Sequence, residues 1–144
     1  MTEIAFHFGA PDRLAYTCRL LRKASATGAR LLVRTSAETV AELDKALWGV
    51  GVVDFVTHCD DAAPMAIRKR SSVLLHDEQR PLKPEVPILV NLSDDVPQGF
   101  EQFQRVIEVV STDEQDRNLA RRRWKRYTEL GYNITRHDLT VRAE

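Results

Sequence analysis

The order of the apolar segments in the first fifty residues constrains the fold of this chain most strongly. Residues 4–8 have strand character, and a Gly-Ala-Pro-Asp turn at 9–12 leads into a segment with apolar residues at helical spacing. Residues 31–33 form a short apolar run typical of a buried parallel strand, and residues 40–47 place apolar side chains on one helical face. This alternation predicts an α/β fold in three layers, with helices on both faces of a mainly parallel sheet.

Residues at the expected helix ends agree with this interpretation. Pro11 and Asp12 suit the first turn of the first helix, and Gly28 suits its C-terminal cap. Thr35 and Glu38 have the spacing of a capping box, which predicts that the second helix begins there.

The rest of the chain continues the pattern less regularly. No repeat or linker divides it, and its 144 residues are 43% hydrophobic, so residues 1–144 are predicted to form one domain. Further strands are expected at 54–58, 73–75, 87–91 and 106–110, a polar surface loop at 77–85, a short helix at 97–104, and a long helix from Thr112 or Asp113 to near Gly131.

The glycine-rich motifs that usually accompany such a fold are missing. The turn after the first strand lacks the G-x-G-x-x-G pattern, and the chain has no phosphate-binding loop and no nucleophile elbow. Close approach of a phosphate to backbone amides needs such glycines. The sequence therefore predicts an α/β layout without the usual α/β chemistry, with no cofactor and no catalytic residues.

The charge balance argues against a protein that mainly grips nucleic acid. The chain has 21 basic and 21 acidic side chains, whereas direct phosphate binding usually brings a basic surplus. It contains no apolar run long enough to span a membrane and no secretory signal, and it has two cysteines. A cytoplasmic protein with reduced thiols and no membrane contact is the expectation.

The cysteines and paired aspartates are the candidate metal ligands, and the cysteines lack the spacing of a known metal site. Cys18 falls on an apolar helix face and is expected in the core, while Cys59 has no second cysteine or histidine at metal-binding spacing. The pairs Asp60/Asp61 and Asp94/Asp95 are expected to be solvated turn residues, although adjacent carboxylates also permit a small metal-dependent nuclease. The sequence thus predicts no metal site.

One segment of the expected final helix stands out by its charge. Residues 117–127 include six basic side chains and no acidic one. At helical spacing, Arg117, Arg121, Trp124 and Lys125 share one face, which combines cations with an aromatic ring. Such a face can bind an acidic peptide with a hydrophobic anchor, or stack single-stranded nucleic acid. The alternative is a solvated basic face with Trp124 half buried in the core.

A second candidate surface lies near the end of the second helix. Trp48 ends the segment Leu-Asp-Lys-Ala-Leu-Trp at 43–48, and Phe55 follows after a short glycine-containing stretch. Large aromatic side chains near the ends of elements are favoured anchors of protein interfaces. Packing of both rings into the local core is the alternative.

These segments together resemble the chi subunit of bacterial DNA polymerase III holoenzyme. The resemblance covers nearly the whole chain and is loosest from residue 62 to 87. It rests on the Leu-Asp-Lys-Ala-Leu-Trp segment at 43–48, Asp-Phe-Val-Thr-His at 54–58, Leu-Ala-Arg-Arg-Arg-Trp-Lys-Arg-Tyr at 119–127, Gly-Tyr-Asn at 131–133 and the strand ending in Phe-His-Phe at 6–8.

The resemblance implies a Rossmann-like fold of the nucleotide-binding type that lacks the nucleotide site. It also implies a non-catalytic accessory subunit of the clamp loader in DNA replication. Chi proteins bind the acidic C-terminal tail of single-stranded-DNA-binding protein, which ends in phenylalanine, and they bind the psi subunit. Psi or a substitute would then link this chain to the clamp loader. Contact with DNA would be mostly indirect, and the chain on its own is expected to be monomeric.

The resemblance also implies where these partners bind. Arg121 and Lys125, with Arg117 nearby, would hold the carboxylates of the tail, and Val110 would help line the pocket for its terminal ring. Trp124 stands where the family has a tyrosine, so any hydrogen bond through that hydroxyl is lost. The psi-facing surface would include Trp48 and Phe55. The main alternative is a basic α/β module that binds single-stranded nucleic acid directly.

Overall fold

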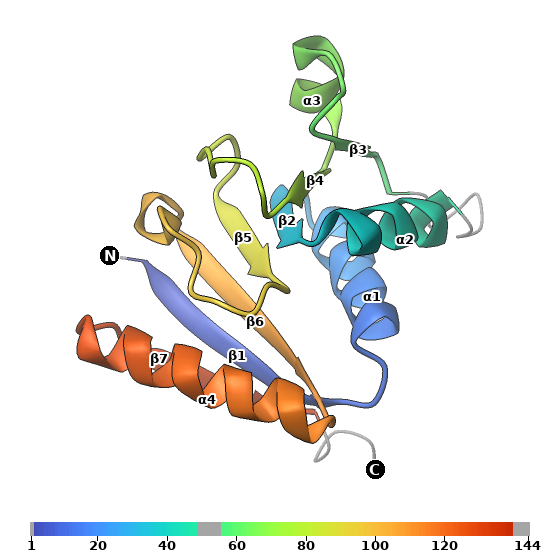
Figure 1. The fold of residues 1–144 in the computed structure, drawn as a ribbon. Helices are drawn as coiled ribbons and strands as arrows, with labels where there is room; N and C mark the ends of the chain where they lie inside the picture. The colour runs from blue at the N-terminus through green and yellow to red at the C-terminus, as the bar shows by residue number, and fades with distance from the viewer. Residues whose placement is uncertain (1, 49–55, 140–144) are drawn as a thin grey trace.

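A single parallel sheet organises the computed structural model, which describes residues 2–48 and 56–139 (Figure 1). Seven strands lie in the order β3-β4-β2-β5-β6-β1-β7, and every neighbouring pair is parallel. They are β1 (Glu3–Ala10), β2 (Leu31–Thr35), β3 (His58–Asp60), β4 (Val73–Asp77), β5 (Ile88–Asn91), β6 (Arg105–Ser111) and β7 (Ile134–Asp138).

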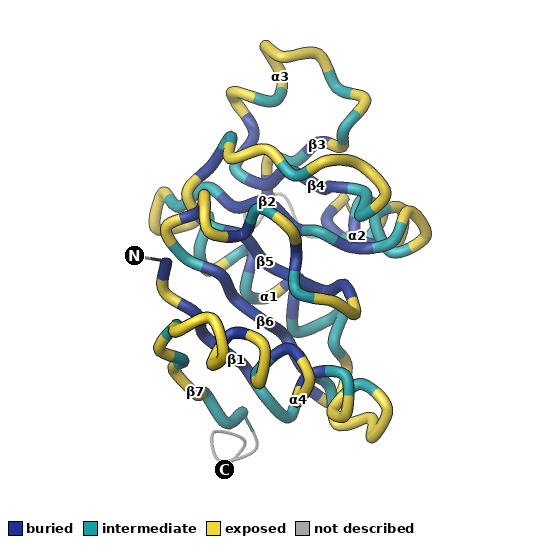
Figure 2. Tube along the Cα trace, turned by 60° about the vertical axis from the view of Figure 1, so that its left-hand side comes forward, coloured by how far each residue is buried: buried dark blue, intermediate teal, exposed yellow. Residues whose placement is uncertain are grey.

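Helices cover both faces of the sheet, so the predicted three-layer α/β fold is confirmed. The helices α1 (Arg13–Ala26) and α2 (Ala37–Trp48) pack on one face. The other face carries α4 (Glu114–Glu129) and the short 3-10 helix η2 (Phe100–Gln102). A six-residue helix, α3 (Met65–Arg70), lies between β3 and β4 and projects from the body of the molecule in both Figure 1 and Figure 2. None of the described helices is both long enough and apolar enough to cross a bilayer.

Alternation of side chains along the strands divides the core in two. In β6, Ile107 and Val109 point toward α1 and α2, whereas Val106 and Val110 point toward α4. All four are buried because the sheet is covered on both sides, as is usual for parallel sheets. Cys18 belongs to the first cluster and Cys59 to the second, as expected of small apolar residues, and burial raises the pKa of the Cys18 thiol.

Most predicted helix boundaries are confirmed, with one correction. Asp12 caps α1 by accepting a hydrogen bond from the Ala15 amide, and Gly28 follows the helix with a φ of 86°. Asp113 caps α4 in the same way. The capping box at Thr35 and Glu38 is wrong, because Thr35 still belongs to β2 and the Ser36 hydroxyl accepts from the Thr39 amide instead.

The predictions between residues 54 and 104 need further correction. The third strand is His58–Asp60, so Val56 and Thr57 precede it, and residues 54 and 55 lie outside the described residues. The expected helix at 97–104 is reduced to η2, and the polar loop after β4 is confirmed. Neither α3 nor β7 was anticipated, because both are short and β7 carries mostly polar side chains.

Truncating a core side chain in a central strand should destabilise the protein strongly. Leu89 of β5 is fully buried. We expect Leu89→Ala to lower the free energy of unfolding by about 2–5 kcal/mol in urea titrations, through lost transfer energy and an unfilled cavity. Leu130→Ala is the matched control: the native side chain is 44% exposed, and we expect a change below about 0.5 kcal/mol. Equal effects at the two sites would contradict this placement of the core.

Candidate peptide-binding site

A buried polar network fixes α4 on the sheet. The carboxylate of Glu108 on β6 accepts hydrogen bonds from Arg123 Nε at 2.9 Å, the Tyr127 hydroxyl at 2.7 Å and Asn91 Nδ2 at 2.9 Å. Arg123 also donates through Nη1 to the carbonyl of Asp94 at 3.1 Å. One carboxylate thereby joins α4 to β5, β6 and the loop after β5, which fixes the rotation of the helix about its own axis.

The charge states in this network follow from its burial. Glu108 is fully buried, and the loss of hydration raises the pKa of its carboxyl group, while Arg123 and the other two donors oppose that rise. Burial, followed by the neighbouring carboxylate, raises the pKa of the Tyr127 hydroxyl, which therefore stays a neutral donor. The three donors replace the water that Glu108 loses.

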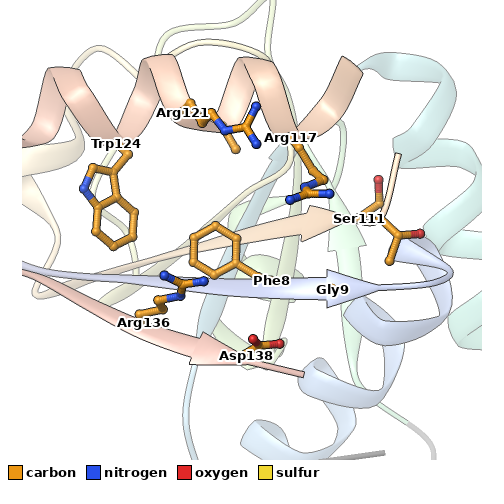
Figure 3. Close-up of a pocket in the computed structure, with 10 residues that line it drawn as sticks. Phe8, Gly9, Ser111, Arg117, Arg121, Trp124, Arg136 and Asp138 are labelled. Atoms are coloured by element: carbon orange, nitrogen blue, oxygen red, sulfur yellow. The ribbon is translucent and has the colours of Figure 1, made fainter. Parts of the chain in front are cut away.

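Because α4 is held in this rotation, its next face opens onto a groove. The groove has a cavity volume of about 510 Å³ and lies between α4 and the C-terminal parts of β1, β6 and β7 (Figure 3). In open parallel sheets, ligands usually bind at the carboxyl ends of the strands, which is where this groove lies. Its lining residues are Phe8, Gly9, Ser111, Thr112, Arg117, Ala120, Arg121, Trp124, Arg136 and Asp138.

Aromatic rings form one side of the groove. Trp124 is half buried, with its ring centroid 5.0 Å from that of Phe6 and 5.9 Å from that of Phe8. The Arg136 guanidinium lies 5.1 Å from the centre of the Phe8 ring, within cation–π range. The rings leave an apolar surface that can cover a hydrophobic side chain of a ligand.

Positive charge dominates the rest of the lining. Arg117 and Arg121 extend from α4 and Arg136 rises from β7, while Asp138 is the acidic lining residue (Figure 3). Arg121 Nη1 donates to the side-chain oxygen of Asn118 at 2.6 Å, so a neutral partner holds it and its charge stays available. Guanidinium groups bind carboxylates in a forked geometry. The groove can therefore take an anionic ligand with an apolar group.

Comparison with known proteins gives the family. The family model of the DNA polymerase III chi subunit, HolC, matches residues 1–135. The chain belongs to the DNA polymerase III chi subunit family. A curated DNA polymerase III subunit chi from Pseudomonas aeruginosa is 30% identical over 132 residues, which cover 88% of this chain and 87% of that protein. The sequence-based resemblance to chi is confirmed.

A solved structure of another protein has a similar fold. The C-terminal domain of Saccharomyces cerevisiae Dbp5, in a variant form bound to Gle1 and IP6, is similar with a TM-score of 0.60. The match covers 94% of the chi chain and 90% of that domain at 14% sequence identity. At this identity the likeness concerns the fold alone.

The structure brings together only part of the predicted chi site. Arg117, Arg121 and Trp124 line the groove as a group. Lys125 is exposed on the same helix but does not line the cavity. Val110 is fully buried in the core layer beneath, and its neighbour Ser111 is the residue of β6 that reaches the groove.

The second predicted surface of this chi chain lies elsewhere. Trp48 is 63% exposed at the end of α2, with its ring centroid 5.2 Å from that of His58. It is half of the predicted psi-facing pair, and the other half, Phe55, lies outside the described residues. Trp48 is therefore an exposed aromatic side chain beside β3, at the sheet edge opposite β7.

Sequence reasoning missed the contribution of β1 and β7 to the groove. Phe8 was recognised only as part of a strand, and Arg136 was not considered because the strand that carries it is short and polar. Only the pairing of β7 with β1 places Arg136 beside Phe8. A signal was available in the alternation of Ile134, Arg136 and Asp138, which share one face of a strand.

The prediction that both carboxylate pairs are solvated turn residues is wrong for Asp61. Asp61 is not a solvated turn residue: its carboxylate accepts from the Asp77 amide at 2.8 Å and lies 3.0 Å from Nδ1 of His76. Nowhere in residues 2–48 and 56–139 do three or more metal-ligating side chains come together. Asp61 thus contributes to the attachment of β3 to β4.

Replacing the buried arginine of the network should destabilise the fold much more than replacing its exposed neighbour. Arg123→Met removes the charged partner of Glu108 and keeps a long apolar chain, so we expect a loss of about 3–5 kcal/mol. Arg122→Met is the control, because Arg122 is exposed on the same helix, and we expect a change within about 0.5 kcal/mol. Chemical denaturation of both variants is the measurement; equal stabilities would exclude the network as an anchor of α4.

Proposed function

We propose that this chain is a non-catalytic tether in the cytoplasm, which binds the acidic C-terminal tail of single-stranded-DNA-binding protein in the groove along α4. The observation that carries the proposal is the lining of that groove: three guanidinium groups stand beside the rings of Phe8 and Trp124. Membership of the chi family supplies the replicative polymerase as the setting.

The two kinds of lining suit the two parts of such a tail. Carboxylates would pair with Arg117, Arg121 and Arg136, and Lys125 would add charge at the rim. The terminal phenylalanine ring would lie against Phe8 and Trp124, and Val110 would support this wall from the core layer beneath.

The expected affinity is modest. Burying one phenylalanine side chain contributes about 1.5–3 kcal/mol, and each charge-assisted hydrogen bond contributes about 1.5–3 kcal/mol before ordering costs. These values are consistent with a dissociation constant in the micromolar range, which corresponds to a binding free energy of about −8 kcal/mol. Coated DNA presents many tails, so weak contacts would gain through effective concentration.

The link to the clamp loader would use the opposite side of the molecule. Trp48, with Phe55, would form the surface for the psi subunit or a substitute. Trp48 lies beside β3, whereas the groove lies beside β7, and these are the two edges of the sheet. One chain could then hold both partners at once.

Tail binding should depend on the groove and on the terminal phenylalanine. With a labelled acidic peptide ending in phenylalanine, we expect saturable binding by fluorescence anisotropy and at least about tenfold weaker binding for Arg121→Ala and Trp124→Ala, which is about 1.4 kcal/mol. Lys125→Ala should have a smaller effect, because Lys125 does not line the cavity. Arg122→Ala is the matched control on the same helix and should bind as the unaltered chain does.

The peptide and an oligonucleotide complete this test. Removal of the terminal phenylalanine should abolish most of the binding, because the rings of the groove then have nothing to cover. If the peptide fails to bind and a single-stranded oligonucleotide binds instead through Arg117 and Arg121, direct nucleic-acid binding replaces the tether as the function.

Salt should weaken the complex. Charge pairs between exposed groups are screened over about 10 Å at 0.1 M ionic strength and about 3 Å at 1 M. We therefore expect the dissociation constant of the tail peptide to rise by at least about tenfold between these conditions, leaving the contribution of the ring. An affinity that does not change with salt would show that the guanidinium groups do not pair with the peptide.

A further inference from the structure

The helix α3 is attached to the rest of the protein by polar contacts and leaves its apolar side chains in solvent. None of its six residues is buried, and Met65 and Ile67 are 57% and 50% exposed. Its anchor is Arg68, whose guanidinium donates to the Asp60 carbonyl at 2.9 Å and forms an ion pair with Glu85. Met65 and Ile67 therefore do not serve to hold α3 in place.

A pocket lies beneath this helix. Its cavity volume is about 330 Å³, and it is bounded by α3, the C-terminal part of β4 and the loop that follows. Leu32, Ala63 and Pro81 contribute apolar walls, and Met65 stands at the same pocket. An apolar side chain from another molecule has a place to enter next to the exposed face of α3.

The exposed charges around this pocket are mostly positive. The acidic lining residues are already engaged: Glu85 pairs with Arg68, and Asp61 contacts His76 and the Asp77 amide. The exposed acid nearby, Asp60, accepts from the Ala62 amide at 2.9 Å. Arg80 and Lys83 line the pocket and are exposed, with Arg80 Nε 3.9 Å from Asp61 Oδ2. Lys69 and Arg70 are exposed on α3.

These observations select one class of partner. The four exposed cations favour a ligand with acidic side chains, and the exposed Met65 and Ile67 favour a ligand that also carries an apolar side chain. Single-stranded nucleic acid is disfavoured, because binding of that kind relies on accessible aromatic rings, and the ring among the lining residues of this pocket, that of His76, is buried. A second copy is disfavoured too, because a two-fold contact would set the same cations against one another.

We propose that α3 and the pocket beneath it form a second docking surface, which binds an acidic protein segment carrying an apolar side chain. This surface does not overlap the groove along α4. The surface follows the C-terminal end of β3, at the sheet edge opposite β7, and Figure 2 shows the helix α3 projecting from the body of the molecule. Trp48 lies near the other end of β3, beside His58. The inference does not rest on the tether function.

Selection from a library of short random peptides displayed on phage tests this surface. The full chain carrying Arg121→Ala would be the target, so that binding in the groove is weakened. We expect enrichment of peptides rich in Asp and Glu with a Leu, Ile or Phe. A synthetic peptide of that sequence should bind Arg121→Ala, and it should bind at least about tenfold more weakly when Ile67→Glu or Lys69→Glu is added to that variant.

The controls separate docking from folding and from the groove. Lys23→Glu changes an exposed lysine on α1 and should leave binding unchanged. Lys69→Glu keeps the proposal testable if Ile67→Glu unfolds, because Lys69 is exposed. A failure of the tail peptide to bind the groove would remove the tether and leave this surface untouched.

Three results would overturn the proposal. The first is a selection that yields no acidic peptide sensitive to Ile67→Glu or Lys69→Glu. The second is self-association in sedimentation experiments that Ile67→Glu abolishes, which would make the occupant a second copy. The third is binding of a single-stranded oligonucleotide that Lys69→Glu abolishes, which would make it a nucleic-acid surface.

Discussion

Covering the sheet with α4 places the carboxylate of Glu108 where water cannot reach it, and the rest of the groove depends on how that carboxylate is satisfied. Arg123 and Tyr127 project from α4 toward it, one helical turn apart, and Asn91 approaches from β5. Only one rotation of α4 about its axis brings both side chains to Glu108. A buried ionic network of this kind adds little net stability but penalises other arrangements heavily.

Because the rotation of α4 is set from the buried side, its neighbouring face is set as well. Arg117, Arg121 and Trp124 lie on that face and turn toward β1 and β7 (Figure 3). A small rotation of the helix would carry the guanidinium groups away from Phe8 and Arg136. The geometry of the groove therefore relies on buried residues that do not line it.

The parallel sheet separates the candidate binding surfaces of this chi family member. Parallel strands leave two edges, β3 and β7, with the buried core between them. The groove lies beside β7, while Trp48 and α3 lie beside β3. Ligands bound at the two edges would therefore not exclude one another.

The sequence by itself determined the fold class and the part of the site that lies on one helix. Strand and helix alternation predicted the three-layer sheet, and helical spacing placed Arg117, Arg121 and Trp124 on one face, because both patterns depend only on neighbours along the chain. Tertiary structure decided the rest. It buried Arg123, one of a run of arginines of similar appearance, against a carboxylate fifteen positions away in sequence. It also paired β7 with β1, which placed Arg136 beside Phe8, and it left Met65 and Ile67 of α3 in solvent. These placements depend on contacts between distant segments, and a local pattern carries no record of such contacts.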